Sequence, residues 1–191
     1  MPVISITLLP GYRPEAEQRL VGRVALAARS VIAAPAAGTT VFVNQASTYQ
    51  RDGRVYNAGG AERPEATAIA RNFLDRMQAR DLAAAARFLA PDFIMQFPGG
   101  PTMQRLEQLV QWSAGRYRSV AKDFEKLDEC WTEDGAIVYC SGTLHGIWLD
   151  GSAFSGIRFI DRFEIADGLI RRQDVWNDLA QAQPALRSPA A

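Results

Sequence analysis

The chain has little of several residue types that particular functions require. Its 191 residues include two cysteines, Cys130 and Cys140, with no Cys-x-x-Cys pair, and a single histidine, His145. Because tetrahedral metal sites are built from clusters of cysteine, histidine and acidic side chains, we expect no metal site and no cofactor. We interpret both cysteines as reduced thiols in the core of a cytoplasmic protein.

The chain also lacks an excess of charge of either sign and long hydrophobic runs. Lysine plus arginine and aspartate plus glutamate each number 21, so the formal net charge is zero. Nucleic-acid-binding domains carry clustered basic residues, and no such cluster is interleaved with aromatics here. The apolar stretches are shorter than the roughly 20 residues of a membrane helix, and we expect no signal peptide before Pro2. We therefore expect a cytoplasmic protein with neither nucleic-acid nor membrane partners.

What the chain does have is a proline directly after the initiator methionine. Residues 3–9 alternate apolar and polar side chains, which predicts a half-buried strand beginning at Pro2. Removal of Met1 would leave a secondary amine at the chain terminus, where the ordinary pKa is about 7.7–8.0. An apolar or arginine-rich setting would lower the pKa of the Pro2 amine and suit it to general base and acid catalysis. The alternative is that Pro2 only assists removal of Met1.

A helix and a second strand follow this first strand. Apolar residues recur at helical spacing from about residue 14 to Pro35, and residues 39–43 read as a strand. A strand–helix–strand unit of this length makes its two strands parallel. Because two strands and one helix cannot close a core, the segment needs partners, and we expect a homo-oligomer.

Residues 2–60 resemble the oxalocrotonate tautomerase family. The motifs that carry this resemblance are Pro2, Gly11, Ala34-Pro35, Val41-Phe42-Val43 and Tyr56-Asn57-Ala58-Gly59-Gly60. The resemblance implies that Pro2 is the catalytic base, that subunits form dimers or hexamers, and that Tyr56 lines the site. The family's two substrate-binding arginine positions fall on Tyr12 and Thr40, with Arg13 one residue late. Tyr12, Arg13 and Thr40 are therefore the candidate substrate-binding residues beside Pro2.

The rest of the chain has a different organisation. Residues 61–65 read as a polar linker, residues 66–180 as a second domain, and the Ala- and Pro-rich residues 181–191 as a disordered tail. Helical patterns come first, and Asp81 is expected to cap the second of them. A short strand is expected near residues 91–97. Four strand-like runs follow, separated by three Asp-Gly pairs, which are strong hairpin signals. Helices followed by an antiparallel meander predict an α+β fold.

Residues 66–180 resemble the SnoaL-like branch of the nuclear transport factor 2-like superfamily. The resemblance is carried by residues 80–82, 88–93, 142–146 and 159–170. It implies a cone of curved antiparallel sheet with three helices around an apolar pocket. The superfamily includes polyketide cyclases, ketosteroid isomerase-like enzymes, dehydratases and proteins that only bind ligands or dimerise.

Asp161 is the candidate catalytic residue of this domain. It alternates with Phe159 and Phe163 on one face of a predicted strand. Burial on an aromatic face favours an uncharged acid, which suits proton transfer to and from carbon. The resemblance also implies that Asp161 occupies the position of the catalytic Asp of the cyclases. The alternative is a structural aspartate that is paired with a neighbouring arginine or hydrogen-bonded in the pocket.

Five further residues are candidates for the pocket wall. Asp174 and Trp176 share one face of the last strand and are expected to face the pocket, together with Phe97 and Trp112; the alternative is that the aromatics are plain core. His145 is the fifth candidate. The histidine of the cyclases falls on Leu144, and a shift of one residue turns a strand side chain to the other face, so a structural or exposed histidine is the alternative.

Together the two segments predict an isomerase of the keto–enol tautomerase type. The expected substrate is a small carbonyl or enol compound on which Pro2 acts as base and acid. The SnoaL-like segment would bind or further convert an apolar or aromatic metabolite, with Asp161 as its acid and base. The alternative is a non-catalytic protein for ligand binding or oligomerisation, built from two enzyme-like folds.

Overall fold

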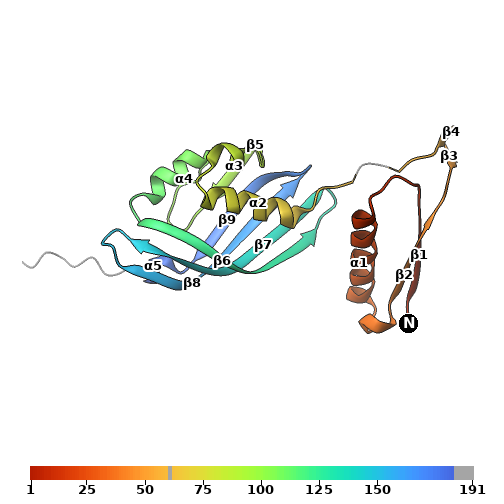
Figure 1. Ribbon diagram of the computed structural model, residues 1–191, viewed down its shortest axis with the longest axis horizontal. Coiled ribbons are helices and arrows are strands. Elements are labelled where there is room, and N and C mark those ends of the chain that lie inside the picture. Colours follow the sequence, from red (N-terminus) through yellow and green to blue (C-terminus); the bar gives the residue numbers. More distant parts are fainter. Residues whose placement is uncertain (60–61, 183–191) are drawn as a thin grey trace, which may run out of the picture. The chain divides into compact units, whose positions relative to one another are not determined.

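The computed structural model describes residues 1–59 and 62–182 and divides the chain into two compact units, Met1–Glu62 and Arg63–Ala191. Figure 1 labels the helices and strands of each unit. The predicted linker begins at residue 61, which lies outside the described residues. The predicted tail begins inside a short helix, and its remainder, 183–191, also lies outside them.

The first unit is a β-α-β arrangement followed by a small hairpin. Its elements are β1 (Val3–Leu8), α1 (Pro14–Val31), a 3-10 turn (Ala36–Gly38), β2 (Thr40–Gln45), β3 (Tyr49–Arg51) and β4 (Arg54–Tyr56). β1 and β2 pair in parallel, which confirms the predicted strand direction. Helix α1 begins at Pro14, where the missing N–H costs nothing, and carries Glu15 and Glu17 at its positive end.

The first unit buries very little of itself. Gly38 is the only buried residue among its described residues, and α1 contains none. Val3 is 66% exposed and Phe42 is 54% exposed, both on the face of the two-stranded sheet that α1 does not cover. The unit therefore has no closed core of its own, as its size predicts.

The second unit places helices on one face of a five-stranded sheet (Figure 1). Its elements are α2 (Ala66–Gln78), α3 (Leu82–Ala86), β5 (Leu89–Gln96), α4 (Leu106–Ser113), β6 (Tyr117–Trp131), β7 (Gly135–Trp148), β8 (Ala153–Ala166), β9 (Leu169–Asn177) and α5 (Leu179–Ala182). The Asp81 side chain accepts a hydrogen bond from the Ala84 amide and caps α3, as predicted. Strands β6 to β9 form the predicted antiparallel meander.

One prediction about the sheet is wrong. The strand order is β5-β9-β8-β7-β6, and β5 pairs with β9 in parallel, so the sheet is mixed and not purely antiparallel. No turn signal in the sequence announces this pairing, because the two strands are joined through most of the domain rather than by a hairpin.

The core lies between α2 and the concave face of the sheet. Phe73 from α2 packs edge-on against Phe163 from β8, with ring centroids 5.9 Å apart, and both side chains are buried. Phe159, Asp161 and Phe163 are buried on one face of β8, which confirms the predicted alternation. Cys140 is buried but Cys130 is exposed, so the interpretation of both cysteines as core thiols is wrong for Cys130.

Two irregularities bend the sheet and change which side chains face the core. In β6 the pairing with β7 shifts between Phe124 and Lys126, opposite Gly142. A Cβ atom on Gly142 would lie 2.0 Å from the Asp123 carbonyl oxygen, so only glycine allows this approach. In β9 the pairing with β8 skips Arg171. A bulge inserts one residue and reverses the alternation that follows it.

Candidate functional site

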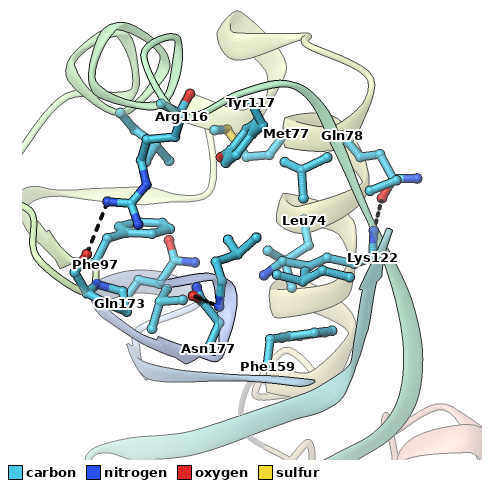
Figure 2. Close-up of a pocket in the computed structure, with 18 of the residues that line it drawn as sticks. Leu74, Met77, Gln78, Phe97, Arg116, Tyr117, Lys122, Phe159, Gln173 and Asn177 are labelled. Atoms are coloured by element: carbon cyan, nitrogen blue, oxygen red, sulfur yellow. Dashed lines mark hydrogen bonds between the residues drawn. The ribbon is translucent and has the colours of Figure 1, made fainter. Parts of the chain in front are cut away.

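The second unit contains a largely apolar cavity between α2, α4 and the concave face of the sheet (Figure 2). Its empty volume is about 900 Å³, including the part that is open to solvent. The apolar side chains that line it are Phe73, Leu74, Met77, Phe97, Leu109, Trp112, Val120, Leu144, Phe159, Val175 and Leu179. Such a wall suits a small apolar or aromatic molecule.

A cluster of three polar side chains interrupts this apolar wall. Lys122 from β6 and Gln173 from β9 line the cavity, and Asp161 from β8 lies directly behind them with no exposed surface. The Lys122 ammonium pairs with Oδ2 of Asp161, and the Gln173 amide donates to the same oxygen at 3.3 Å. One carboxylate oxygen is thus held by two donors.

The other oxygens of this cluster are not satisfied. Oδ1 of Asp161 and Oε1 of Gln173 are buried and have no hydrogen-bond partner in the part of the chain that the structure describes. A buried acceptor without a donor costs about 1–3 kcal/mol. Since most buried polar atoms are paired, these two oxygens set the cluster apart from the rest of the core.

Lys122 is held by two contacts of its side chain and one of its backbone. Its Nζ atom lies 4.4 Å from the centroid of the Phe159 ring, a cation–π distance, as well as against Asp161. Its backbone amide donates to the Gln78 side chain at 3.2 Å, which ties β6 to α2 (Figure 2). The ammonium is therefore fixed between a carboxylate and an aromatic face at the cavity wall.

The buried thiol next to Asp161 remains uncharged at neutral pH. Cys140 is directly opposite Asp161 in the β7–β8 pairing. Burial, and to a lesser extent the negative charge of Asp161, raises the pKa of the Cys140 thiol to about 12. The thiol therefore adds no second negative charge to the cluster.

Two arginines line another part of the cavity. The Arg116 guanidinium stacks on the Trp112 ring at 4.4 Å, and Arg80 follows α2. Burial raises the pKa of Tyr117, while the charges of Arg80 and Arg116 act to lower it, so both cations lie near its hydroxyl. Within residues 1–59 and 62–182 neither arginine forms an ion pair. Nη1 of Arg116 donates to the Pro98 carbonyl oxygen at 3.5 Å, and no carboxylate of these residues balances the charge of either guanidinium.

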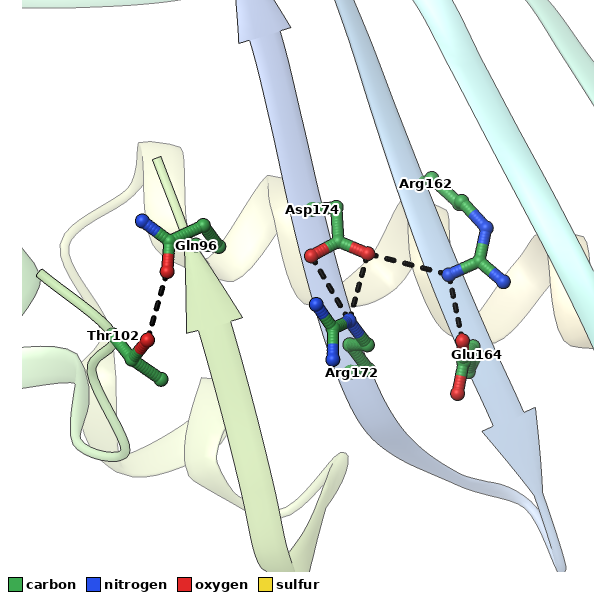
Figure 3. A network of polar contacts seen from close by, with 6 residues as sticks. All are labelled: Gln96, Thr102, Arg162, Glu164, Arg172 and Asp174. Carbon is green, nitrogen blue, oxygen red and sulfur yellow. Dashed lines mark hydrogen bonds and ion pairs between the residues drawn. The ribbon is translucent and has the colours of Figure 1, made fainter. Parts of the chain in front are cut away.

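The structure brings some of the predicted pocket residues together and separates others. Phe97 and Trp112 line the cavity as predicted, with ring centroids 5.8 Å apart. Trp176 is 54% exposed, and Asp174 lies on the opposite face of the sheet, where it pairs with Arg162 and Arg172 (Figure 3). The prediction that Asp174 and Trp176 face the pocket is wrong.

The bulge at Arg171 is the physical reason why Asp174 and Trp176 do not face the cavity. A strict alternation from the buried Ile170 would place residues 172, 174 and 176 on the inner face. The extra residue reverses this, so that Gln173 and Val175 are buried instead. Sequence reasoning missed Gln173 for this reason.

His145 also lies outside the cavity. Its Nδ1 atom contacts an Asp123 oxygen at 2.9 Å, and its side chain is 45% exposed. The adjacent Leu144 lines the cavity instead. His145 as a substrate-binding residue is therefore corrected to the exposed alternative.

The predicted residues of the first unit fall into two groups. The Pro2 carbonyl accepts a hydrogen bond from the Thr40 amide at 3.1 Å, so these residues lie at the same end of the β1–β2 pair. Tyr12 and Arg13 follow the other end of β1, and a six-residue strand separates the two ends by roughly 20 Å. One copy of the unit therefore does not bring Pro2 and Arg13 together.

Tyr12, Arg13 and Tyr56 are each held by local contacts. Arg13 pairs with Glu62 at 2.7 Å, and this hydrogen bond raises the pKa of Arg13. The Tyr12 ring lies close against Gly59, where any Cβ atom would clash with it. Tyr56 stacks on Tyr49 with ring centroids 5.2 Å apart.

The comparisons with known proteins concern the second unit. The model of the SnoaL-like domain matches residues 70–173, which is more than half of the chain. The chain belongs to the SnoaL-like domain family. The family match does not extend to residues 2–60, and a search of curated proteins found no match.

Solved structures share the fold of the SnoaL-like unit. An NTF2-like protein of unknown function from Burkholderia pseudomallei has a TM-score of 0.53 and 15% identity, covering 60% of this chain and 92% of that one. TerC, co-crystallised with polyporic acid, has a TM-score of 0.52 and 17% identity, with coverages of 60% and 92%. A SnoaL-like polyketide cyclase homologue from Jannaschia sp. CCS1 has a TM-score of 0.50 and 16% identity, with coverages of 69% and 100%.

In residues 1–59 and 62–182, no three His, Cys, Asp and Glu side chains gather closely enough to hold a metal ion. None of the helices in these residues is both long and apolar enough to cross a membrane.

Proposed function

We propose that the SnoaL-like unit is an enzyme of the isomerase or cyclase type that moves a proton on a small, mainly apolar carbonyl compound. The observation that carries the proposal is the fully buried Asp161 beside the cavity, with Oδ2 held by two donors and Oδ1 without a donor in residues 1–59 and 62–182. Removal of a proton from carbon needs a base whose oxygen is not already occupied by a donor.

Proton removal next to a carbonyl group needs a donor to the carbonyl oxygen and a base for the proton, and neighbouring groups can supply both. The Lys122 ammonium, at the cavity wall, can donate to the carbonyl oxygen of a substrate and stabilise the negative charge that develops there. Asp161 then takes the proton from the adjacent carbon and returns it to the same or another carbon. The apolar wall excludes water, which strengthens both interactions.

Deuterium exchange tests this proposal without knowledge of the natural substrate. The probes are benzylacetone, an aromatic ketone, and benzylacetone with a para-carboxylate. We expect the native protein to accelerate incorporation of deuterium next to the carbonyl in heavy water, followed by NMR, and Asp161→Asn to abolish the acceleration. Binding of both probes with no exchange above buffer would identify a ligand-binding protein instead.

We further propose that the first unit carries a tautomerase-type site at Pro2. Its parallel β1–α1–β2 arrangement, with Pro2 at the start of β1, supports this proposal. Because Arg13 lies at the other end of β1, the site would be completed by residues of a second copy.

Two measurements test the Pro2 site. Intact mass of the protein isolated from cells should show that Met1 has been removed. Pro2→Ala should then lower the rate of phenylpyruvate ketonisation by about 100-fold, the range of a lost general base. Asp123→Asn, which changes an exposed aspartate of the second unit, should leave this rate unchanged. Retention of Met1 in the cellular protein would rule out catalysis by the Pro2 amine.

We also propose that the first unit associates with a second copy of itself. Its uncovered sheet face exposes Val3 and Phe42, and its described residues bury only Gly38. Light scattering coupled to gel filtration should give a mass of at least two chains, and Phe42→Glu should reduce it to one chain. The control is Leu149→Glu, which introduces the same charge at an exposed apolar residue of the second unit. A native protein that runs as a single chain would contradict the proposal.

A further inference from the structure

The basic residues of the chain are almost all arginine. Of its 21 lysine and arginine residues only two are lysines, Lys122 and Lys126. Lys126 is exposed and pairs with Asp128 on the surface, whereas Lys122 lines the cavity. If the cavity required only a positive charge, arginine would serve, as it does elsewhere in the chain. A lysine differs because it can lose its proton and act as a nucleophile, which a guanidinium does not do.

A proton acceptor is in contact with the Lys122 ammonium. The ammonium is in contact with the fully buried Asp161 carboxylate and lies over the Phe159 ring. Transfer of one proton from the ammonium to the carboxylate produces a neutral amine and a neutral acid without changing the total charge. Because buried charges are costly in an apolar setting, this exchange costs much less there than in water. The amine is then at the cavity wall with a free lone pair.

We propose that Lys122 forms an imine with the carbonyl group of the substrate. This inference rests on the proposed function, which supplies the carbonyl compound. Reversible imine formation is a known use of a lysine held in an apolar pocket. It would give the enzyme a stronger electron acceptor than a hydrogen-bonded carbonyl, since a protonated imine carries a full positive charge next to the carbon that loses its proton.

The chemistry balances with groups that the site already contains. The Lys122 ammonium passes a proton to Asp161, and the resulting amine nitrogen bonds to the carbonyl carbon. The nitrogen gives up one proton and the former carbonyl oxygen gains one, which leaves a neutral carbinolamine. Asp161 returns its proton to the hydroxyl group, the C–O bond breaks, and water leaves. The product is a protonated imine beside the Asp161 carboxylate, which is then free to take a proton from the neighbouring carbon.

The arginines define the class of substrate further. Figure 2 shows Arg116 and Lys122 on different sides of the cavity, with apolar side chains between them. A carbonyl group at Lys122 and a carboxylate at Arg80 and Arg116 would therefore belong to opposite ends of one molecule. The structure points to an oxo acid with an aromatic or other apolar body, for which para-carboxylated benzylacetone is a simple probe.

Reductive trapping tests the inference directly. The full-length protein is incubated with the para-carboxylated probe and sodium cyanoborohydride, which converts an imine to a stable secondary amine. We expect peptide mapping by mass spectrometry to place the adduct on Lys122 and to show at least about tenfold faster labelling there than at Lys126 or the chain terminus. Equal labelling of the two lysines, or labelling of the terminus alone, would overturn the inference.

Matched variants support the mapping. Lys122→Arg keeps the positive charge beside Asp161 but cannot form an imine, so the adduct at this position should disappear. Lys126→Arg should leave the adduct at Lys122 unchanged. Circular dichroism checks that each variant is folded, and the result for the native protein does not depend on either of them.

Deuterium exchange without the reductant separates this inference from the proposed function. If Lys122→Arg still exchanges deuterium as fast as the native protein, the imine is not part of the reaction, although the proposed function stands. If the native protein traps the probe at Lys122 but does not accelerate exchange, the imine is supported and the proposed proton transfer is wrong.

Discussion

Asp161→Asn is expected to lower the rate of deuterium exchange by about 100- to 10,000-fold, the contribution typical of a positioned general base. The amide keeps the size and planar shape of the carboxyl group but accepts no proton at neutral pH. The native Oδ1 atom has no donor among the described residues, so the substitution removes the one oxygen free to take the proton. Initial rates of exchange measured by NMR at saturating ketone report this loss.

The matched control is Asp123→Asn. Asp123 is also an aspartate paired with a basic side chain, but it contacts the exposed His145 and lies outside the cavity. Its replacement should leave the exchange rate within about twofold of the native value, since surface substitutions rarely alter stability or geometry. An Asp161→Asn protein that is folded and still exchanges at the native rate would exclude Asp161 as the base.

The same substitution has a second consequence, for stability. It leaves the Lys122 ammonium in a largely buried site without its carboxylate, and removal of one member of a buried ion pair costs about 3–5 kcal/mol. That is a large part of the 5–15 kcal/mol that keeps a typical domain folded. Urea unfolding should show this decrease in the free energy of unfolding of Asp161→Asn. A double variant, Asp161→Leu with Lys122→Met, removes both charges and should be more stable than Asp161→Asn while remaining inactive.

Replacing both Arg80 and Arg116 by glutamine should weaken binding of the para-carboxylated probe by about 100-fold, since a hydrogen bond to a charged group contributes about 1.5–3 kcal/mol. Both side chains line the cavity without an ion-pair partner among the described residues. Benzylacetone itself carries no carboxylate, so its affinity should be unchanged. Isothermal titration calorimetry with the two ketones gives both values.

Arg118→Gln is the control for this pair. The Arg118 side chain donates to the Leu149 carbonyl oxygen and does not line the cavity. It should leave the affinity for both ketones unchanged. Added salt should also weaken binding of the carboxylated ketone more than that of benzylacetone, because screening acts on charge pairs. Equal losses for both ketones in the double variant would mean that the arginines shape the cavity and do not bind the carboxylate.

Regular periodicity carried the predictions that proved correct. The alternation of Phe159, Asp161 and Phe163 predicted a buried acid on the inner face of β8, and the structure buries all three. The Asp-Gly pairs predicted the meander because the turn itself sets which strands are neighbours. These signals are local, and each depends on a few consecutive residues.

The sequence predictions failed where the structure departs from regularity. The parallel β5–β9 pairing joins distant segments and leaves no local signal. Sequence reasoning missed Lys122, although Lys122 is two residues after Val120 and therefore shares the inward face of the strand. A lysine on a strand is ordinarily exposed. The scarcity of lysine in the chain was the signal that could have singled it out.

The extra residue Arg171 has a consequence for how such a site can change over time. A bulge absorbs one additional residue without disturbing the strand pairing on either side of it. If Arg171 were deleted, Arg172 alone would separate Ile170 from Gln173, so Ile170, Gln173 and Val175 would still face inward. The length of this strand can therefore change by one amino acid at this point while the cavity keeps the same polar group. Relatives without the extra residue are correctly compared with this chain only when a gap is placed at the bulge, because an ungapped alignment would match Gln173 with an outward-facing residue.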